Sequence, residues 1–193
     1  MKRQVLKGVL RLILVLGAFA TPAMAQNREK AWEINPYAGI VWFDKVEGEQ
    51  LLNDTWDLGF RFGYHWTKSQ MVEFGFYGGA TDDGLDQGID VDLLGGQVNY
   101  VYNFFLTRRD RVVGFATGGF GAVNISSFGF VSDPDLIGEE IEFTYNYGLG
   151  IRLFGGQRSG FRFDIRSTTF SDNGVDIHFL EAAVGMTIVL GGA

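Results

Sequence analysis

The residues best placed to do chemistry are ten charged side chains that occur within stretches of alternating polar and apolar residues. They are Glu33, Asp57, Arg61, Glu73, Glu142, Arg152, Arg162, Asp164, Arg166 and Glu181. In one enclosed space they could form a selective pore or a ligand cage, or they could neutralise one another as a packed polar core. Buried charges need partners, and four arginines against six acids is close to balance. The composition therefore favours the packed core.

Nucleophilic catalysis would need a serine beside a histidine that accepts its proton. The chain has two histidines, His65 and His178. The serines that could lie near His178 are Ser126, Ser127 and Ser171. His178 follows Asp176, but the alternation turns its ring away from the charged face, and nothing orients a serine toward it. We predict that the protein is not an enzyme.

Two acidic stretches could bind divalent cations through carboxylate oxygens. They comprise Asp82, Asp83, Asp86, Asp90 and Asp92, and separately Asp133 and Asp135. Neither has the spacing of a defined calcium loop, and such stretches are more often solvated. We expect no metal site and no cofactor.

The first 25 residues have the pattern of a secretory signal peptide. Four basic residues precede an apolar run over residues 12–19, and Ala23-Met24-Ala25 forms a small-x-small cleavage site. The apolar run is too short to span a bilayer comfortably. Cleavage would leave residues 26–193 as a single domain with 12 basic and 23 acidic residues, a net charge of −11. This balance argues against nucleic-acid binding.

The stretch Thr55–Thr67 shows what kind of element carries the charges. Its even positions are Trp56, Leu58, Phe60, Phe62, Tyr64 and Trp66, and its odd positions between them are Asp57, Gly59, Arg61, Gly63 and His65. Successive side chains of a strand point to opposite faces, so one face is wholly apolar or aromatic. Ten residues of a tilted strand rise roughly 25 Å, close to the apolar band of an outer-membrane barrel. Trp56 and Trp66 would then lie at the two membrane interfaces.

Eight runs of this kind follow the leader. They are Trp32–Phe43, Thr55–Thr67, Met71–Thr81, Val91–Leu106, Val112–Ile125, Ile141–Phe154, Phe161–Phe170 and Val175–Leu190. No 20-residue apolar segment occurs among them, which argues against helical spans. Long acidic connections alternate with short basic ones, as in outer-membrane barrels. We predict an all-β fold, an eight-stranded antiparallel up-and-down transmembrane β-barrel, with its long connections outside the cell.

Residues 32–190 resemble the small eight-stranded outer-membrane barrels, the OmpA-type transmembrane domain and its OmpX-like relatives. Gly185, Ile188 and Leu190 in the last strand are similar to the terminal signature read by the barrel-assembly machinery. The resemblance implies a location in the cell outer membrane, with membrane lipid and lipopolysaccharide as partners and a monomeric state. It also implies a role in envelope integrity or surface contact through the acidic outer loops. The alternatives are a small passive channel or a carrier for small or apolar solutes of the OmpW kind, and then a lipid-modifying enzyme.

Short turns predict which charged residues meet. Asn173-Gly174 is a strong two-residue hairpin signal and places Arg166 opposite Glu181. A turn at residues 156–160 would place Asp164 opposite Arg152, and a turn at residues 68–70 would place His65 opposite Glu73. The predicted polar network of the barrel interior comprises Arg61, His65, Glu73, Arg152, Asp164, Arg166 and Glu181.

Overall fold

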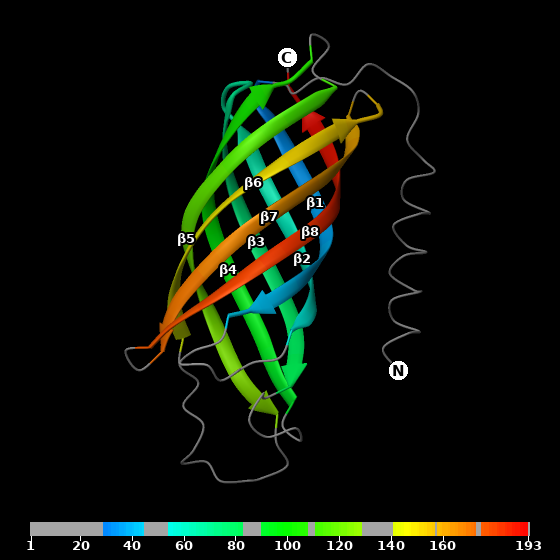
Figure 1. The fold of residues 1–193 in the computed structure, drawn as a ribbon. Helices are drawn as coiled ribbons and strands as arrows, with labels where there is room; N and C mark the ends of the chain where they lie inside the picture. The colour runs from blue at the N-terminus through cyan, green and yellow to red at the C-terminus, as the bar shows by residue number, and fades with distance from the viewer. Residues whose placement is uncertain are drawn as a thin grey trace.

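The computed structural model describes residues 29–44, 54–82, 90–107, 111–128, 141–156, 158–172 and 175–192. Its strands are β1 (Ala31–Phe43), β2 (Thr55–His65), β3 (Gln70–Asp82), β4 (Asp90–Phe105), β5 (Val112–Phe128), β6 (Ile141–Phe154), β7 (Ser159–Asp172) and β8 (Val175–Gly191). Each strand pairs antiparallel with its neighbour in sequence, and β1 pairs with β8 to close the barrel (Figure 1). The predicted fold class is confirmed. The predicted signal peptide, residues 1–25, lies outside the described residues.

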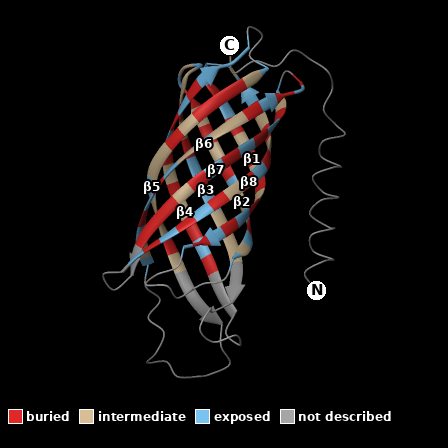
Figure 2. Ribbon diagram, viewed as in Figure 1, coloured by how far each residue is buried: buried red, intermediate tan, exposed pale blue. Residues whose placement is uncertain are grey.

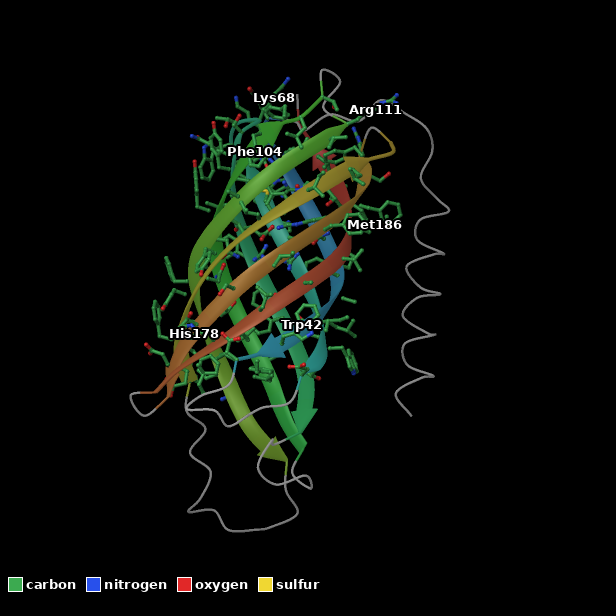
Figure 3. All side chains as sticks on the ribbon, viewed as in Figure 1. Trp42, Lys68, Phe104, Arg111, His178 and Met186 are labelled. Carbon is green, nitrogen blue, oxygen red and sulfur yellow. The ribbon has the colours of Figure 1, made fainter. Side chains whose placement is uncertain are left out.

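The two ends of the barrel differ in their connections. One end, called the turn end, carries the connections β2–β3, β4–β5 and β6–β7 together with the start of β1 and the end of β8. The opposite, loop end carries the four remaining connections, three of which are long. Figure 3 shows Lys68 and Arg111 at the turn end, and His178 and Trp42 toward the loop end. Within the described residues, no helix is long and apolar enough to cross a membrane.

Alternate residues of each strand are buried in the barrel interior, the lumen, and exposed on the outer wall (Figure 2). All four tryptophans of the chain lie on the outer wall, on or directly after β1 and β2: Trp32, Trp42, Trp56 and Trp66. Trp32 and Trp42 on β1 are ten residues apart, and so are Trp56 on β2 and Trp66 directly after it. They are 37–43% exposed, which suits indole rings placed at membrane interfaces.

Glycines make room in the lumen for large side chains of neighbouring strands. A Cβ added to Gly59 would lie 2.3 Å from the ring of Tyr37, and one added to Gly95 would lie 2.1 Å from the ring of Tyr77. An eight-stranded barrel encloses a space that side chains just fill. A large side chain on one strand therefore needs a glycine at the facing position of the neighbouring strand.

Two predicted registers are wrong by two residues. His65 pairs with Met71 because residues 66–69 connect β2 and β3 in place of the predicted turn at 68–70, and in this connection the Gln70 backbone N–H donates to Thr67 Oγ1 at 3.0 Å. Likewise Arg152 pairs with Arg162, and Asp164 with Gly150. A shift of two leaves every side chain on its predicted face, since strand side chains alternate with a period of two.

Candidate functional site

Among the described residues, ten buried arginine, histidine, aspartate and glutamate side chains lie in the lumen. They are Glu33, Asp57, Arg61, His65, Glu73, Arg152, Arg162, Asp164, Arg166 and Glu181. All seven residues of the predicted polar network are in this set. Strands β1, β2, β3, β6, β7 and β8 supply them, whereas the described lumen positions of β4 and β5 are uncharged.

The centre of the network is a cage of three arginines around two acids. Asp164 accepts hydrogen bonds from Arg61 NH1 at 2.8 Å, Arg162 Nε at 3.0 Å and Arg166 Nε at 3.1 Å. Glu73 accepts from Arg162, and from Arg166 NH2 at 2.6 Å. Every one of these groups is almost fully removed from solvent. Charge-assisted bonds in such surroundings are strong, and the loss of one partner leaves another charge uncompensated.

A second cluster lies toward the turn end, around Glu33. Its Oε2 is 2.9 Å from His65 Nε2, and its Oε1 accepts from Arg152 Nε at 3.0 Å. Arg152 NH1 also donates to Asn103 Oδ1 at 2.7 Å. The carboxylate partner of His65 is therefore Glu33 on β1, and the predicted His65–Glu73 pair is wrong. Arg152 is likewise held by Glu33 and not by Asp164.

Toward the loop end the network thins. Arg61 NH2 donates to Glu181 Oε1 at 3.0 Å. Among the described residues, this is the one ion pair that Glu181 forms. Arg166 lies opposite Glu181 in the β7–β8 ladder, as the turn at Asn173-Gly174 predicts. Its guanidinium nevertheless binds Glu73 and Asp164.

Aromatic rings support the guanidinium groups. The Arg61 guanidinium carbon lies 3.7 Å from the centroid of the Tyr37 ring. Phe115 is stacked against two cations, with the Arg152 and Arg162 guanidinium carbons 4.3 and 4.4 Å from its centroid. The negative face of an aromatic ring attracts a cation, so these rings help to fix the arginine planes.

Apolar clusters lie on both sides of the charges. At the loop end the cluster comprises Val41, Phe43, Leu93, Val123, Phe170, Ile177 and Phe179, with Tyr77 packed against it. At the turn end two smaller clusters comprise Ala31, Val113, Phe154 and Val189, and Met71, Val101 and Phe115. The lumen is thus layered: apolar, charged, apolar.

Sequence reasoning left Glu33 and Arg162 out of the linked network, although alternation did turn both inward. It missed the apolar layers altogether. A signal exists at the loop end, where Ile40–Phe43 and Ile177–Leu180 are apolar on both faces except for His178. Such runs mark strand segments that face apolar surroundings both in the lumen and on the lipid side.

Among the side chains that the structure describes, Thr169 is the hydrogen-bond partner of His178. Its ring is exposed on the outer wall, and its Nδ1 lies 2.7 Å from Thr169 Oγ1. The side chains of Ser126, Ser127 and Ser171, and of the acidic stretches at residues 82–92 and 133–135, lie outside the described set. Among the side chains that are described, no group of three or more His, Asp or Glu residues could hold a metal ion.

Comparison with known proteins places this geometry among membrane barrels. Residues 12–187 match the family described as outer membrane protein beta-barrel domain. Among solved structures, Neisserial surface protein A aligns with a TM-score of 0.62 at 11% identity, over 83% of this chain and 99% of the other. OprG from Pseudomonas aeruginosa aligns with a TM-score of 0.62 at 11% identity, over 89% of this chain and all of the other. The outer membrane enzyme PagL aligns with a TM-score of 0.51 at 16% identity, over 81% of this chain and 98% of the other. At these identities the likeness shows the fold alone, and no curated protein sequence matches the chain.

Proposed function

Because this chain belongs to the outer membrane protein beta-barrel domain family, we propose that it is a non-enzymatic structural protein of the outer membrane, acting through its loop end in envelope integrity or surface contact. The observation that carries the proposal is the closed lumen. A protein whose interior is filled by its own side chains offers its surface, and not its interior, to partners.

The charged layer supports a closed lumen. Asp164 and Glu73 together engage three arginines, so a permeating ion would have to displace partners held at 2.6–3.1 Å. Separating such a buried pair costs about 3–5 kcal/mol when the partner is left alone. A steady water column would require several of these bonds to open together.

The apolar layers support it as well. Phe43, Phe170 and Phe179 meet in the lumen at the loop end, and the rings of Phe43 and Phe179 are 5.5 Å apart. An apolar constriction in a pore opposes ion flow by excluding water.

The charge of the two ends suits a surface role. Described acids at the loop end include Asp44, Asp54 and Asp176, all exposed. The turn end carries the exposed bases Arg111 and Arg158. We infer that the acidic loop end faces outward, where it shares divalent cations with lipopolysaccharide phosphates. The barrel reaches the membrane through the barrel-assembly machinery and acts as a monomer.

A second candidate function is passive carriage of small apolar solutes. The observation in its favour is the same loop-end cluster, because seven buried apolar side chains lining a barrel mouth could also receive an apolar molecule. Lipid modification is the third candidate, since an enzyme occurs among proteins of this shape.

The proposal is tested in planar bilayers with the purified barrel. We expect no stable conductance above that of protein-free membranes, and a steady large single-channel current would overturn it. Uptake of an apolar fluorophore into proteoliposomes tests the second candidate, with Phe43→Ala as the variant that should raise uptake if solutes pass that layer. Incubation with lipid extract tests the third. Deletion of residues 45–53 should weaken envelope integrity in cells without lowering the amount of barrel.

A further inference from the structure

The buried charges of the lumen do not balance without an added proton. The described lumen holds four arginines, five carboxylates and one histidine, all of them buried. Arginine stays protonated in proteins. With every carboxylate ionised and His65 neutral, the buried network would carry a net charge of −1. An uncompensated charge in a dry interior is costly, so one group should hold a proton.

Three of the five carboxylates already have enough cationic partners. Asp164 contacts three arginines, and Glu73 contacts Arg162 and Arg166. Glu33 contacts Arg152, with Arg162 NH1 at 3.6 Å and His65 also beside it. Protonating any of these three would weaken several bonds at once.

The histidine is a poor place for the proton. His65 is fully buried, and its Nδ1 has no hydrogen-bond partner among the described atoms. A neutral ring that donates from Nε2 to Glu33 leaves only a lone pair at Nδ1 unsatisfied. A charged ring would leave a buried N–H of a cation unsatisfied, which costs more.

Asp57 and Glu181 are the remaining pair, and they lie together. Both approach Gly39: a Cβ added there would lie 2.1 Å from Asp57 Oδ1 and 3.3 Å from Glu181 Cγ. Glu181 shares one arginine, Arg61, which is also bound to Asp164. Asp57 forms no ion pair with any residue that the structure describes, and its Oδ1 has no hydrogen-bond partner there. Two carboxylates that share a site resist double ionisation.

We propose that Asp57 and Glu181 form a proton-binding site in the lumen, which holds one proton between them at neutral pH. Its ligand is a proton taken from water during folding. The site lies where the charged layer meets the loop-end apolar layer, so the bound proton removes the one charge that the arginines leave uncompensated.

Groups on every strand around the site set its electrostatics. Strand β1 supplies Tyr37, and β3 supplies Tyr77. Arg61 lies on β2, the strand that also carries Asp57. Strand β7 supplies Arg162, Asp164 and Arg166. Arg61 is the cation that pairs with Glu181 among the described residues, and its bond to Asp164 divides its charge between two acids. Arg61 is thus shared between Asp164 and Glu181, and Asp57 is left without an ion pair among the described residues, which favours one proton on the Asp57–Glu181 pair.

Infrared spectroscopy of the wild-type barrel in detergent tests the site directly. A protonated carboxyl group has a carbonyl stretch that is separate from the carboxylate bands and shifts in deuterated water. We expect this band at neutral pH, where exposed carboxyls are ionised, and we expect Asp57→Asn to remove it. Glu142→Gln is the control, the same kind of change at a carboxyl that is only partly buried and is not one of the buried charges of the network, and it should keep the band.

Unfolding as a function of pH gives a second readout. Unfolded aspartate and glutamate release their protons near pH 4, whereas the folded pair keeps one. Above about pH 7, where an unfolded histidine is neutral as well, the folded barrel therefore binds one more proton than the unfolded chain, and its stability falls as pH rises. The unfolding constant should increase up to about tenfold per pH unit until the folded pair releases its proton. Asp57→Asn should abolish this component, because asparagine is neutral at every pH.

The outcomes separate the possibilities whether or not the barrel conducts. A wild-type spectrum without the protonated band at neutral pH overturns the proposal, even if the variant fails to fold. The proposal is also overturned if the Asp57→Asn barrel loses as much stability at neutral pH as the Glu73→Gln barrel loses. Stabilisation of the wild type by millimolar Na⁺ or Ca²⁺ with no protonated band would assign the site to a metal cation and reject the proton.

Discussion

Arg166 stands directly opposite Glu181 in the β7–β8 ladder, yet its guanidinium binds Glu73 across the lumen, with NH2 and Oε1 2.6 Å apart. Cross-strand position therefore does not decide ion pairing in this barrel. Long side chains that point into a narrow interior reach the far wall as easily as the adjacent strand. The network consequently ties β7 to β3 and β2, strands that are not hydrogen-bonded to it.

Removing Glu73 should destabilise the barrel strongly. Glu73→Ala leaves Arg162 and Arg166 buried with fewer partners, at a cost of about 3–5 kcal/mol. Urea unfolding in detergent micelles measures the loss. Glu142→Gln is the control, because this acid is only partly buried at the loop end, and it should change stability by less than about 1 kcal/mol. Equal losses in the two variants would contradict the central role of Glu73.

Added bulk at Gly59 should be harmful, whereas added bulk at Gly118 should be tolerated. A methyl group at Gly59 would collide with the Tyr37 ring at 2.3 Å, but at Gly118 the nearest atom, the Asn146 carbonyl oxygen, is 3.7 Å away. Gly59→Ala should cost about 1–3 kcal/mol through overpacking. Thermal unfolding of the two alanine variants checks this. A tolerant Gly59 would mean that Tyr37 does not occupy the space next to it.

A cation on the lipid face should impair insertion. Phe60 is 42% exposed on the outer wall, and Phe60→Arg should cost about 2–4 kcal/mol if the position lies near the bilayer centre. Folding yield into lipid vesicles measures the effect. Phe60→Leu keeps the surface apolar and should insert like the wild type. Normal insertion of the arginine variant would show that this wall does not face lipid.

Cleavage and localisation can be checked in cells. The chain recovered from the outer-membrane fraction should begin at Gln26, and its gel mobility should shift on boiling as a detergent-resistant barrel unfolds. Amino-terminal sequencing and unheated gels make the measurement. A chain that retains residues 1–25 would refute the predicted cleavage site.

The architecture could be predicted from the sequence because each strand carries a period-two pattern of its own. Thr55–His65 needs no other strand to show which face is apolar, and alternation alone turned Arg61 and Glu181 inward. Faces and strand number follow from such local patterns, so both could be predicted.

Register and ion pairing could not be predicted in the same way. The β2–β3 connection spans residues 66–69, where the Thr67 hydroxyl accepts the Gln70 N–H, a local bond that competes with the turn predicted at residues 68–70. The pairing of Glu33 with His65 and Arg152 depends on three strands, β1, β2 and β6, meeting in one space. Only closure of the barrel sets that geometry, and no single hairpin contains it.

The tryptophans are distributed asymmetrically around the barrel in the plane of the membrane. Because all four belong to β1, β2 and the residue after β2, the indole rings lie on one side of the barrel only. Their two ten-residue intervals correspond to roughly 25 Å along the membrane normal for strands tilted by about 40°. On this side indole rings define the hydrophobic thickness, whereas β7 and β8 carry no tryptophan or tyrosine. In a thicker bilayer the mismatch would be relieved unevenly, with the lipid thinned beside β1 and β2 and the whole cylinder inclined about that edge.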